Sequence, residues 1–114
     1  MEQQISILVQ KIKDDYRNWW ARQYKGDENF PSHVQDMINT FNQSVTVKYG
    51  KKYIKIIKDG SVWGFIVNVE NDKKFNYGDI LKAASYNVPA RNKARGNIMD
   101  NDFSWVNWTG PSYI

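Results

Sequence analysis

The spacing of apolar residues changes once along this chain, near residue 44, and that change limits the possible folds more than any other feature. Before it, apolar side chains recur every three or four residues, which predicts amphipathic helices. After it, they alternate with polar ones, which predicts half-buried strands. Helices followed by strands are typical of an α+β fold, in which the helices pack on one face of an antiparallel sheet.

The helical part divides into two segments. The apolar stripe of the first is Ile5, Leu8, Val9, Ile12, Tyr16, Trp19 and Trp20, and that of the second is Val34, Met37, Ile38 and Phe41. We expect the first helix to end near Gly26 and the second to begin at Pro31 and Ser32. Ser32 and Gln35 have the spacing of a capping box, in which each side chain binds an unpaired amide of the first turn.

Two turns divide the following residues into three strands, at 45–49, 53–58 and 61–69. Gly50 and Lys51 form the first turn. Asp59 and Gly60 form the second, because this dipeptide tolerates the positive φ angles of a type I′ hairpin turn. The sequence therefore predicts an antiparallel meander.

Both turns predict the same apolar face for this meander. Two-residue turns at these positions pair Val45 with Ile56, Val47 with Ile54, Ile54 with Phe65, and Ile56 with Trp63. The opposite face then carries Tyr53, Lys55, Ile57, Val62, Gly64 and Ile66. This second face is more apolar than a solvated face requires, so we expect it to be covered, either by the C-terminal segment or in a homodimer.

The C-terminal third is less regular. Residues 71–72 indicate a turn and residues 73–77 a short strand. Asp79 then has the character of a cap for a short helix through Ile80, Leu81, Ala83 and Ala84, with a strand at 78–81 as the alternative. Residues 89–97 form a basic loop, and residues 103–108 a last strand before the break at residues 109–111. The whole chain, 1–114, is expected to form one domain.

Several classes of function lack the residues they need. The chain has no cysteine, which excludes disulfides, thiolate zinc sites and a cysteine nucleophile, and fits a reducing cytoplasm. It has no membrane-spanning apolar stretch and no signal-peptide pattern. His33 is the only histidine. Asp100 and Asp102 lie in a segment whose Asp and Asn residues are typical of a turn. We therefore expect no enzyme activity, no cofactor, no bound metal and no membrane association.

The charge is concentrated in the middle of the chain. Residues 1–47 carry a net charge of −1, residues 48–95 carry +7, and residues 96–114 carry −2. A basic middle between weakly acidic ends favours an anionic partner, although lysines that solubilise one face of a sheet would give the same pattern.

The best candidate for an anion site is the basic loop. Arg91, Lys93, Arg95 and Asn97 supply donors for a phosphate or a carboxylate. Lys52 and Lys55 of the basic middle complete the predicted site, for which nucleic acid is the expected partner. Arginines in such loops also hold backbone carbonyls in place, and the residues alone leave both interpretations open.

Aromatic residues form a second candidate. Trp105, Trp108 and Tyr113 lie in a tail without lysine or arginine. They can complete the core, stack on bases, or anchor a partner protein.

One resemblance adds a biological setting. Residues 78–85, Pro89-Ala90, residues 94–98 and residues 108–111 resemble the C-terminal half of small uncharacterised proteins of tailed bacteriophages, over about residues 50–114. The resemblance implies an accessory protein acting in the cytoplasm of a bacterial host. Our leading hypothesis is a non-enzymatic phage protein that binds nucleic acid. The alternative is an inhibitor that binds a host protein of defence or transcription.

Overall fold

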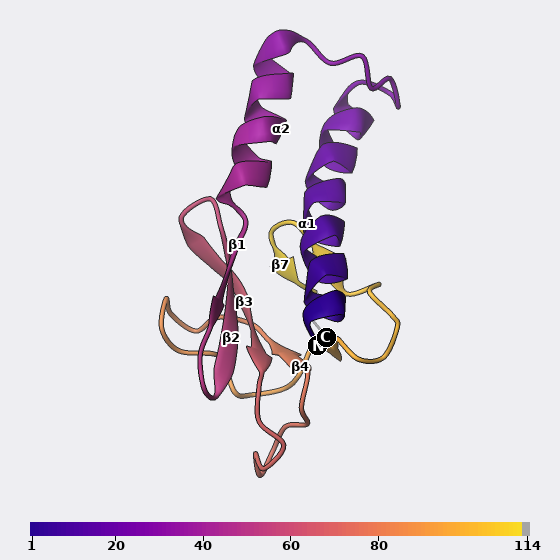
Figure 1. The fold of residues 1–114 in the computed structure, drawn as a ribbon. Helices are drawn as coiled ribbons and strands as arrows, with labels where there is room; N and C mark the ends of the chain where they lie inside the picture. The colour runs from indigo at the N-terminus through magenta and orange to yellow at the C-terminus, as the bar shows by residue number, and fades with distance from the viewer. Residues whose placement is uncertain (113–114) are drawn as a thin grey trace.

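Two antiparallel helices lie side by side at the top of Figure 1, and the N-terminal part of the first continues downward beside the sheet. The computed structural model describes residues 1–112, with α1 at Glu2–Gln23 and α2 at Ser32–Ser44. The buried residues of α1 are Ile5, Leu8, Ile12 and Tyr16, and Val9 and Trp20 pack partly buried against the same core. The predicted stripe is therefore confirmed except at Trp19, which is half-buried outside that core cluster. The predicted stop is also confirmed: Gly26 has a φ of 84°, and its amide donates to the Ala21 carbonyl at 2.8 Å.

The capping box predicted for α2 is wrong. Pro31 occupies the N-cap position, and no side chain caps the helix. Ser32 is already the first helical residue, so its hydroxyl is one position too late to reach the amides of the first turn. The Gln35 side-chain amide donates instead to the Phe30 carbonyl, at 2.8 Å.

The strands form an antiparallel sheet below α2 and beside α1, as Figure 1 shows. Its order is β1-β2-β3-β4-β5, with β1 at Thr46–Tyr49, β2 at Tyr53–Lys58, β3 at Ser61–Val67, β4 at Asp79–Leu81 and β5 at Gly96–Asn97. A separate two-stranded sheet joins β6, Val106–Asn107, to β7, Gly110–Pro111. The predicted α+β class and the meander of the first three strands are confirmed.

The first turn of the meander lies one residue later than predicted. Tyr49 pairs with Ile54, and the Gly50 amide donates to the Tyr53 carbonyl at 3.0 Å, so Lys51 and Lys52 form the turn. Val47 therefore pairs with Ile56 and not with Ile54. Because the partner of each β1 residue shifts by two positions, which is an even number, the same apolar side chains still face the helices.

The predicted pairing of the second hairpin is wrong, because a β-bulge shifts the register. The turn itself is confirmed, with φ angles of 48° at Asp59 and 76° at Gly60. Ile57 pairs with Val62 but Ile56 pairs with Gly64, which leaves Trp63 as the extra residue. Trp63 still packs in the core beside the helices, as expected. Beyond the bulge the alternation is reversed, so Ile66 replaces Phe65 on that face.

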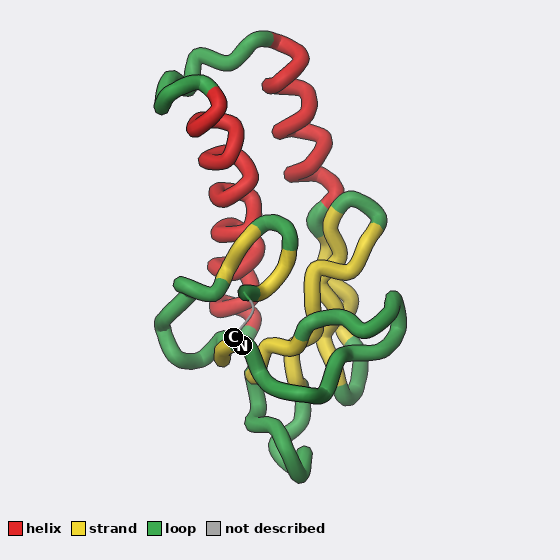
Figure 2. The backbone as a smooth tube through the Cα atoms, turned by 180° about the vertical axis from the view of Figure 1, so that it is seen from behind, coloured by secondary structure: helices red, strands yellow, loops and turns green. Residues whose placement is uncertain are grey.

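Chain segments beside β4 cover the second face of the sheet. Phe65, Val67 and Leu81 cluster there with Phe75 of the β3–β4 connection, and Ala83 and Ala94 of the β4–β5 connection pack against them. Figure 2 shows the long β4–β5 loop passing across the strands on the side away from the helices. The described part of the C-terminal segment, up to residue 112, does not provide this cover, because its apolar residues pack with α1 instead.

Three predicted elements near the C-terminus are wrong. Residues 79–81 form β4, which corrects the short helix in favour of the alternative strand. Residues 73–77 are not a strand, because Asp72 holds them in a turn. Of the strand expected at 103–108, only Val106–Asn107 is a strand, β6. Gly110 and Pro111, expected as a break, form β7 and pair with β6.

The β6–β7 hairpin joins the C-terminal segment to α1. The Trp108 amide donates to the Asp15 carboxylate at 2.8 Å, and the Trp63 indole donates to the Asn107 carbonyl at 2.7 Å. The two weakly acidic parts of the chain therefore lie together, and the basic middle forms the sheet and its loops. No helix within residues 1–112 is long and apolar enough to cross a membrane.

Candidate nucleic-acid interface

Three segments of the basic middle meet at the end of the sheet where β2 begins. They are the β1–β2 turn, the β3–β4 connection and the residues around Arg91, and together they enclose a hollow of about 470 Å³. The residues that line it are Lys51, Lys52, Val69, Asn71, Asp72, Lys73 and Arg91. Residues from three distant parts of the sequence thus contribute cations to one concave surface.

Asp72 organises this hollow. Its Oδ1 accepts hydrogen bonds from the Lys74 amide at 2.8 Å, the Phe75 amide at 2.9 Å and the Arg91 guanidinium at 2.9 Å. The side chain is only 2% exposed. The Arg91 guanidinium, followed by the two backbone amides, holds the pKa of Asp72 well below its usual range. Asp72 is therefore a fixed, ionised group that shapes the loop.

Arg91 bridges the hollow to the sheet. It donates to the Tyr53 hydroxyl through its other terminal nitrogen, and its guanidinium lies 4.9 Å from the centre of the Phe75 ring. The hydrogen bond to Asp72, the largest cause, raises the pKa of Arg91 further above its ordinary value. This arginine therefore holds the loop on the outer face of the sheet, as well as lining the hollow.

A second hollow of about 360 Å³ adjoins the first and shares Lys51 and Lys52 with it. Its remaining lining residues are Lys48, Tyr49, Gly50, Tyr53, Lys55, Phe65 and Asn87. We call the combined surface the basic groove, defined by Lys48, Tyr49, Lys51, Lys52, Lys55, Lys73 and Arg91. Among the described residues, Asp72 is the one carboxylate that lines it, and Arg91 already neutralises that charge.

Exposed aromatic rings accompany these cations. Tyr49 is 59% exposed at the end of the edge strand β1, and Tyr86 is 51% exposed on the β4–β5 loop. The Lys55 ammonium lies 4.2 Å from the centre of the Tyr86 ring and donates to the Asn87 side chain at 3.1 Å. The arrangement offers flat apolar surfaces beside positive charge, which are the two features that unpaired nucleotides bind.

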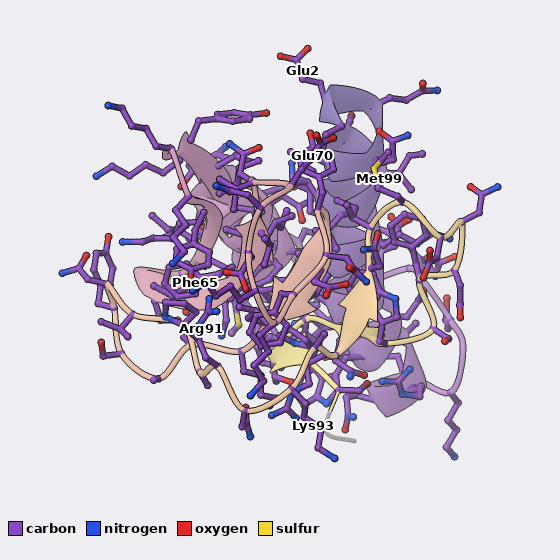
Figure 3. All side chains as sticks on the ribbon, turned by 90° about the horizontal axis from the view of Figure 1, so that it is seen from below. Glu2, Phe65, Glu70, Arg91, Lys93 and Met99 are labelled. Carbon is purple, nitrogen blue, oxygen red and sulfur yellow. The ribbon has the colours of Figure 1, made fainter. Side chains whose placement is uncertain are left out.

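The structure separates the residues predicted for the anion site. Lys52, Lys55 and Arg91 lie in the basic groove. Lys93 is exposed and points away from the body of the protein in Figure 3. Arg95 is only 8% exposed, and its amide donates to the Ile80 carbonyl at 2.8 Å.

Asn97 has a structural environment. Its side-chain amide donates to the Tyr77 carbonyl and to Asp79, both at 2.9 Å, and its side-chain oxygen accepts from the Met99 amide at 2.8 Å. These contacts fasten β5 to β4. The cations and the asparagine of residues 91–97 are therefore not gathered around one anion-sized space.

The predicted aromatic residues also differ in their surroundings. Trp105 is buried in the main core, where its ring centre lies 6.4 Å from that of Trp63. Trp108 is half-buried at the surface between the helices. Tyr113 lies outside the described residues.

Sequence reasoning missed several residues of the groove: Lys48, Tyr49, Lys51, Lys73 and Tyr86. Lys51 and Lys52 form a basic pair in a turn, which was the available signal. Lys73 and Tyr86 carried none, because only the folded connections bring them to the sheet. His33 is exposed, and within residues 1–112 no three side chains of the metal-binding types lie close enough together to hold an ion.

The chain belongs to a protein family described as "Family of unknown function (DUF7717)", whose model matches residues 1–114. The family therefore covers the helices as well as the C-terminal half on which the resemblance depended. Neither the comparison with curated proteins nor the comparison with solved structures found a match.

Proposed function

We propose that this protein binds single-stranded nucleic acid through the basic groove. The observation that carries the proposal is the composition of that surface: six cationic side chains, one neutralised carboxylate and two exposed tyrosine rings at its borders. We further propose that it acts as a non-enzymatic accessory protein of a tailed phage in the host cytoplasm. That setting is supported by the resemblance of the C-terminal half.

Phosphates would bind at the β1–β2 turn. Lys51 and Lys52 project from a two-residue turn, and Lys73 approaches the same hollow from the β3–β4 connection. All three are exposed, so their ammonium groups can reach a ligand, although Lys52 would give up its contact with the Tyr53 ring, whose centre lies 5.6 Å from the ammonium. Each phosphate contact releases condensed counterions, which makes the affinity depend on salt.

The tyrosines favour single strands over a duplex. A paired base is already stacked on its neighbours, whereas an unpaired base gains by stacking on a protein ring. Tyr49 and Tyr86 flank the groove on separate segments and leave about half or more of their surface accessible. Such stacking tolerates any base, so we expect little sequence preference.

Titration of a fluorescent single-stranded oligonucleotide at several salt concentrations tests the proposal. Lys52→Ala should make the slope of log affinity against log salt shallower by roughly 0.7. Tyr49→Leu should weaken binding by roughly fivefold or more at every salt concentration, because it removes a stacking ring and no charge. Lys11→Ala, at an exposed position on α1, is the matched control and should leave the slope unchanged.

Two results would contradict the proposal. One is the absence of wild-type binding even at low salt. The other is binding that Lys52→Ala and Lys11→Ala weaken equally, because that would indicate a general attraction to a basic protein and no defined groove.

A further inference from the structure

A second concave site lies at the opposite end of β2. It is a hollow of about 320 Å³ between α1, α2, the β2–β3 turn and Trp108. The residues that line it are Tyr16, Asp36, Met37, Thr40, Phe41, Asp59 and Trp108. The strand between this pocket and the basic groove has six residues, which corresponds to roughly 20 Å. Both sites can therefore be occupied at once.

The inner wall of this pocket is a preformed aromatic cluster. The rings of Tyr16 and Phe41 stack with their centres 4.1 Å apart, and Trp108 meets Tyr16 edge-on at 5.0 Å. The hydrogen bond from the Trp108 amide to Asp15 fixes the backbone that carries the indole. A ligand would meet rings whose positions are set by the core.

One of these rings already attracts a cation of the protein itself. The Lys58 ammonium lies 5.5 Å from the centre of the Trp108 ring, within the range of a cation–π interaction. Trp108 is thus placed where a positive charge can approach its indole. The remaining wall is formed by Met37, which is 46% exposed, and Thr40.

Two carboxylates give the pocket the opposite charge to the basic groove. Asp36 on α2 and Asp59 in the β2–β3 turn both line it, and both are exposed. Among the described residues, neither carboxylate accepts a hydrogen bond or forms an ion pair, and no lysine or arginine is part of the lining. The residues that line the pocket therefore carry negative charge and offer two open acceptors beside apolar walls.

We propose that this pocket binds an arginine side chain of a partner protein. A guanidinium is flat, stacks on aromatic rings and forms paired hydrogen bonds with carboxylates. Its aliphatic stem can pack on Met37 and Thr40 while the charged end reaches Asp36 and Asp59. An uncharged ligand would gain no ion pair with either carboxylate, so charge complementarity favours a cation.

Short capped peptides with a central arginine, lysine or citrulline residue test this assignment. Citrulline has nearly the shape of arginine but no charge. Titrations followed by NMR on the full chain should show saturable shifts of the Trp108 indole and the Met37 methyl group with the arginine peptide. The citrulline peptide should give none at the same concentrations, and the lysine peptide should bind more weakly.

Matched substitutions locate the binding. Asp36→Asn and Asp59→Asn should each weaken the arginine peptide by about two- to fivefold, the usual range for an exposed ion pair. Asparagine also tolerates the positive φ of residue 59, so the turn should persist. Asp100→Asn makes the same charge change outside the pocket and should have no effect.

Three outcomes would overturn the proposal: no saturable shift at Trp108, an equal response to citrulline, or lysine binding as tightly as arginine. Oligonucleotide titration of the same variants separates this site from the basic groove. Asp36→Asn should leave the salt slope of nucleic-acid binding unchanged, so the two proposals can fail independently.

Discussion

The two faces of the five-stranded sheet are covered in different ways. The inner face packs against α1 and the C-terminal hairpin, in a continuous cluster that includes Ile12, Ile56, Trp63 and Trp105. The outer face has a smaller cluster around Phe65, covered by irregular connections. An amphipathic helix pairs its backbone N–H and C=O groups within itself. A loop does not, so it needs side-chain hydrogen bonds to hold it against a sheet.

Those anchors explain why the candidate interface lies on the outer side. The Asp72–Arg91 pair, the Tyr53 hydroxyl and the Lys74 ammonium, which donates to the Arg91 carbonyl at 2.6 Å, fix the loops with hydrogen bonds that do not involve Lys51, Lys52 or Lys73. Lys51, Lys52 and Lys73 consequently remain at the surface around the anchor. Apolar packing therefore dominates the inner face, and polar contacts combined with free charge dominate the outer one. The following substitutions test this contrast in order of decreasing expected effect.

The largest effect is expected at the centre of the inner face. Trp63→Ala should destabilise the protein by about 3 to 5 kcal/mol, because the buried ring leaves a cavity. It also removes the donor of the Asn107 carbonyl. Denaturant unfolding measures the loss, and Trp63→Phe, which keeps most of the volume, should cost less. A loss below about 1 kcal/mol would contradict the importance of this face.

An intermediate effect is expected where β5 meets the same core. A Cβ added to Gly96 would lie 2.5 Å from the Trp105 ring, so Gly96→Ala should cost about 1 to 3 kcal/mol through overpacking. Thermal unfolding of the single and double variants provides the check. In a Trp105→Leu background, the additional cost of Gly96→Ala should fall by more than half, because the obstructing ring is gone. If Gly96→Ala costs as much in the Trp105→Leu background as in the wild type, the strain does not come from contact with the Trp105 ring.

A smaller, pH-dependent effect is expected on the outer face. The pKa of Asp72 is lowered in the folded protein, so its ionised form stabilises the fold. This stabilisation is fully present above the ordinary value of 3.8 and is lost as the pH falls below it toward the lower folded-state pKa. Melting temperatures measured from pH 7 down to pH 2 should fall less steeply for Asp72→Asn than for the wild type.

Arg91 provides the control for that titration. Arg91→Ala should lower the melting temperature at pH 7 and should also flatten the acid dependence, because the main cause of the Asp72 pKa shift is gone. If Asp72→Asn and the wild type have parallel pH profiles, the ion pair contributes nothing measurable and the outer cover depends on its remaining contacts, chiefly the apolar packing around Phe75.

The smallest effect is expected at Lys93. Its exposed side chain points away from the protein, so Lys93→Ala should change the unfolding free energy by less than about 0.5 kcal/mol. We also expect a smaller change in oligonucleotide affinity than for Lys52→Ala, because Lys93 does not line the groove. A larger change would extend the interface along the β4–β5 loop.

Local signals in the sequence determined both helices, the stop at Gly26, the Asp59-Gly60 hairpin and the α+β class. Each of these depends on residues within a few positions of one another: a 3.6-residue period, an alternation, or a turn that tolerates positive φ. The basic character of the middle segment also followed from composition alone. Arg91 was identified, but its partner Asp72 was not.

The tertiary structure decided the features that depend on distant residues. The bulge at Trp63 places Phe65 on the outer face. No local rule predicts this bulge, because consecutive residues of β3 are apolar and either alternate set could face the helices. The cover of the outer face, the separation of Arg91 from Arg95, and the meeting of Lys51 with Lys73 likewise arise from contacts across the chain. Composition determined the charge of the groove, and long-range packing decided which of those charges lie together at the surface.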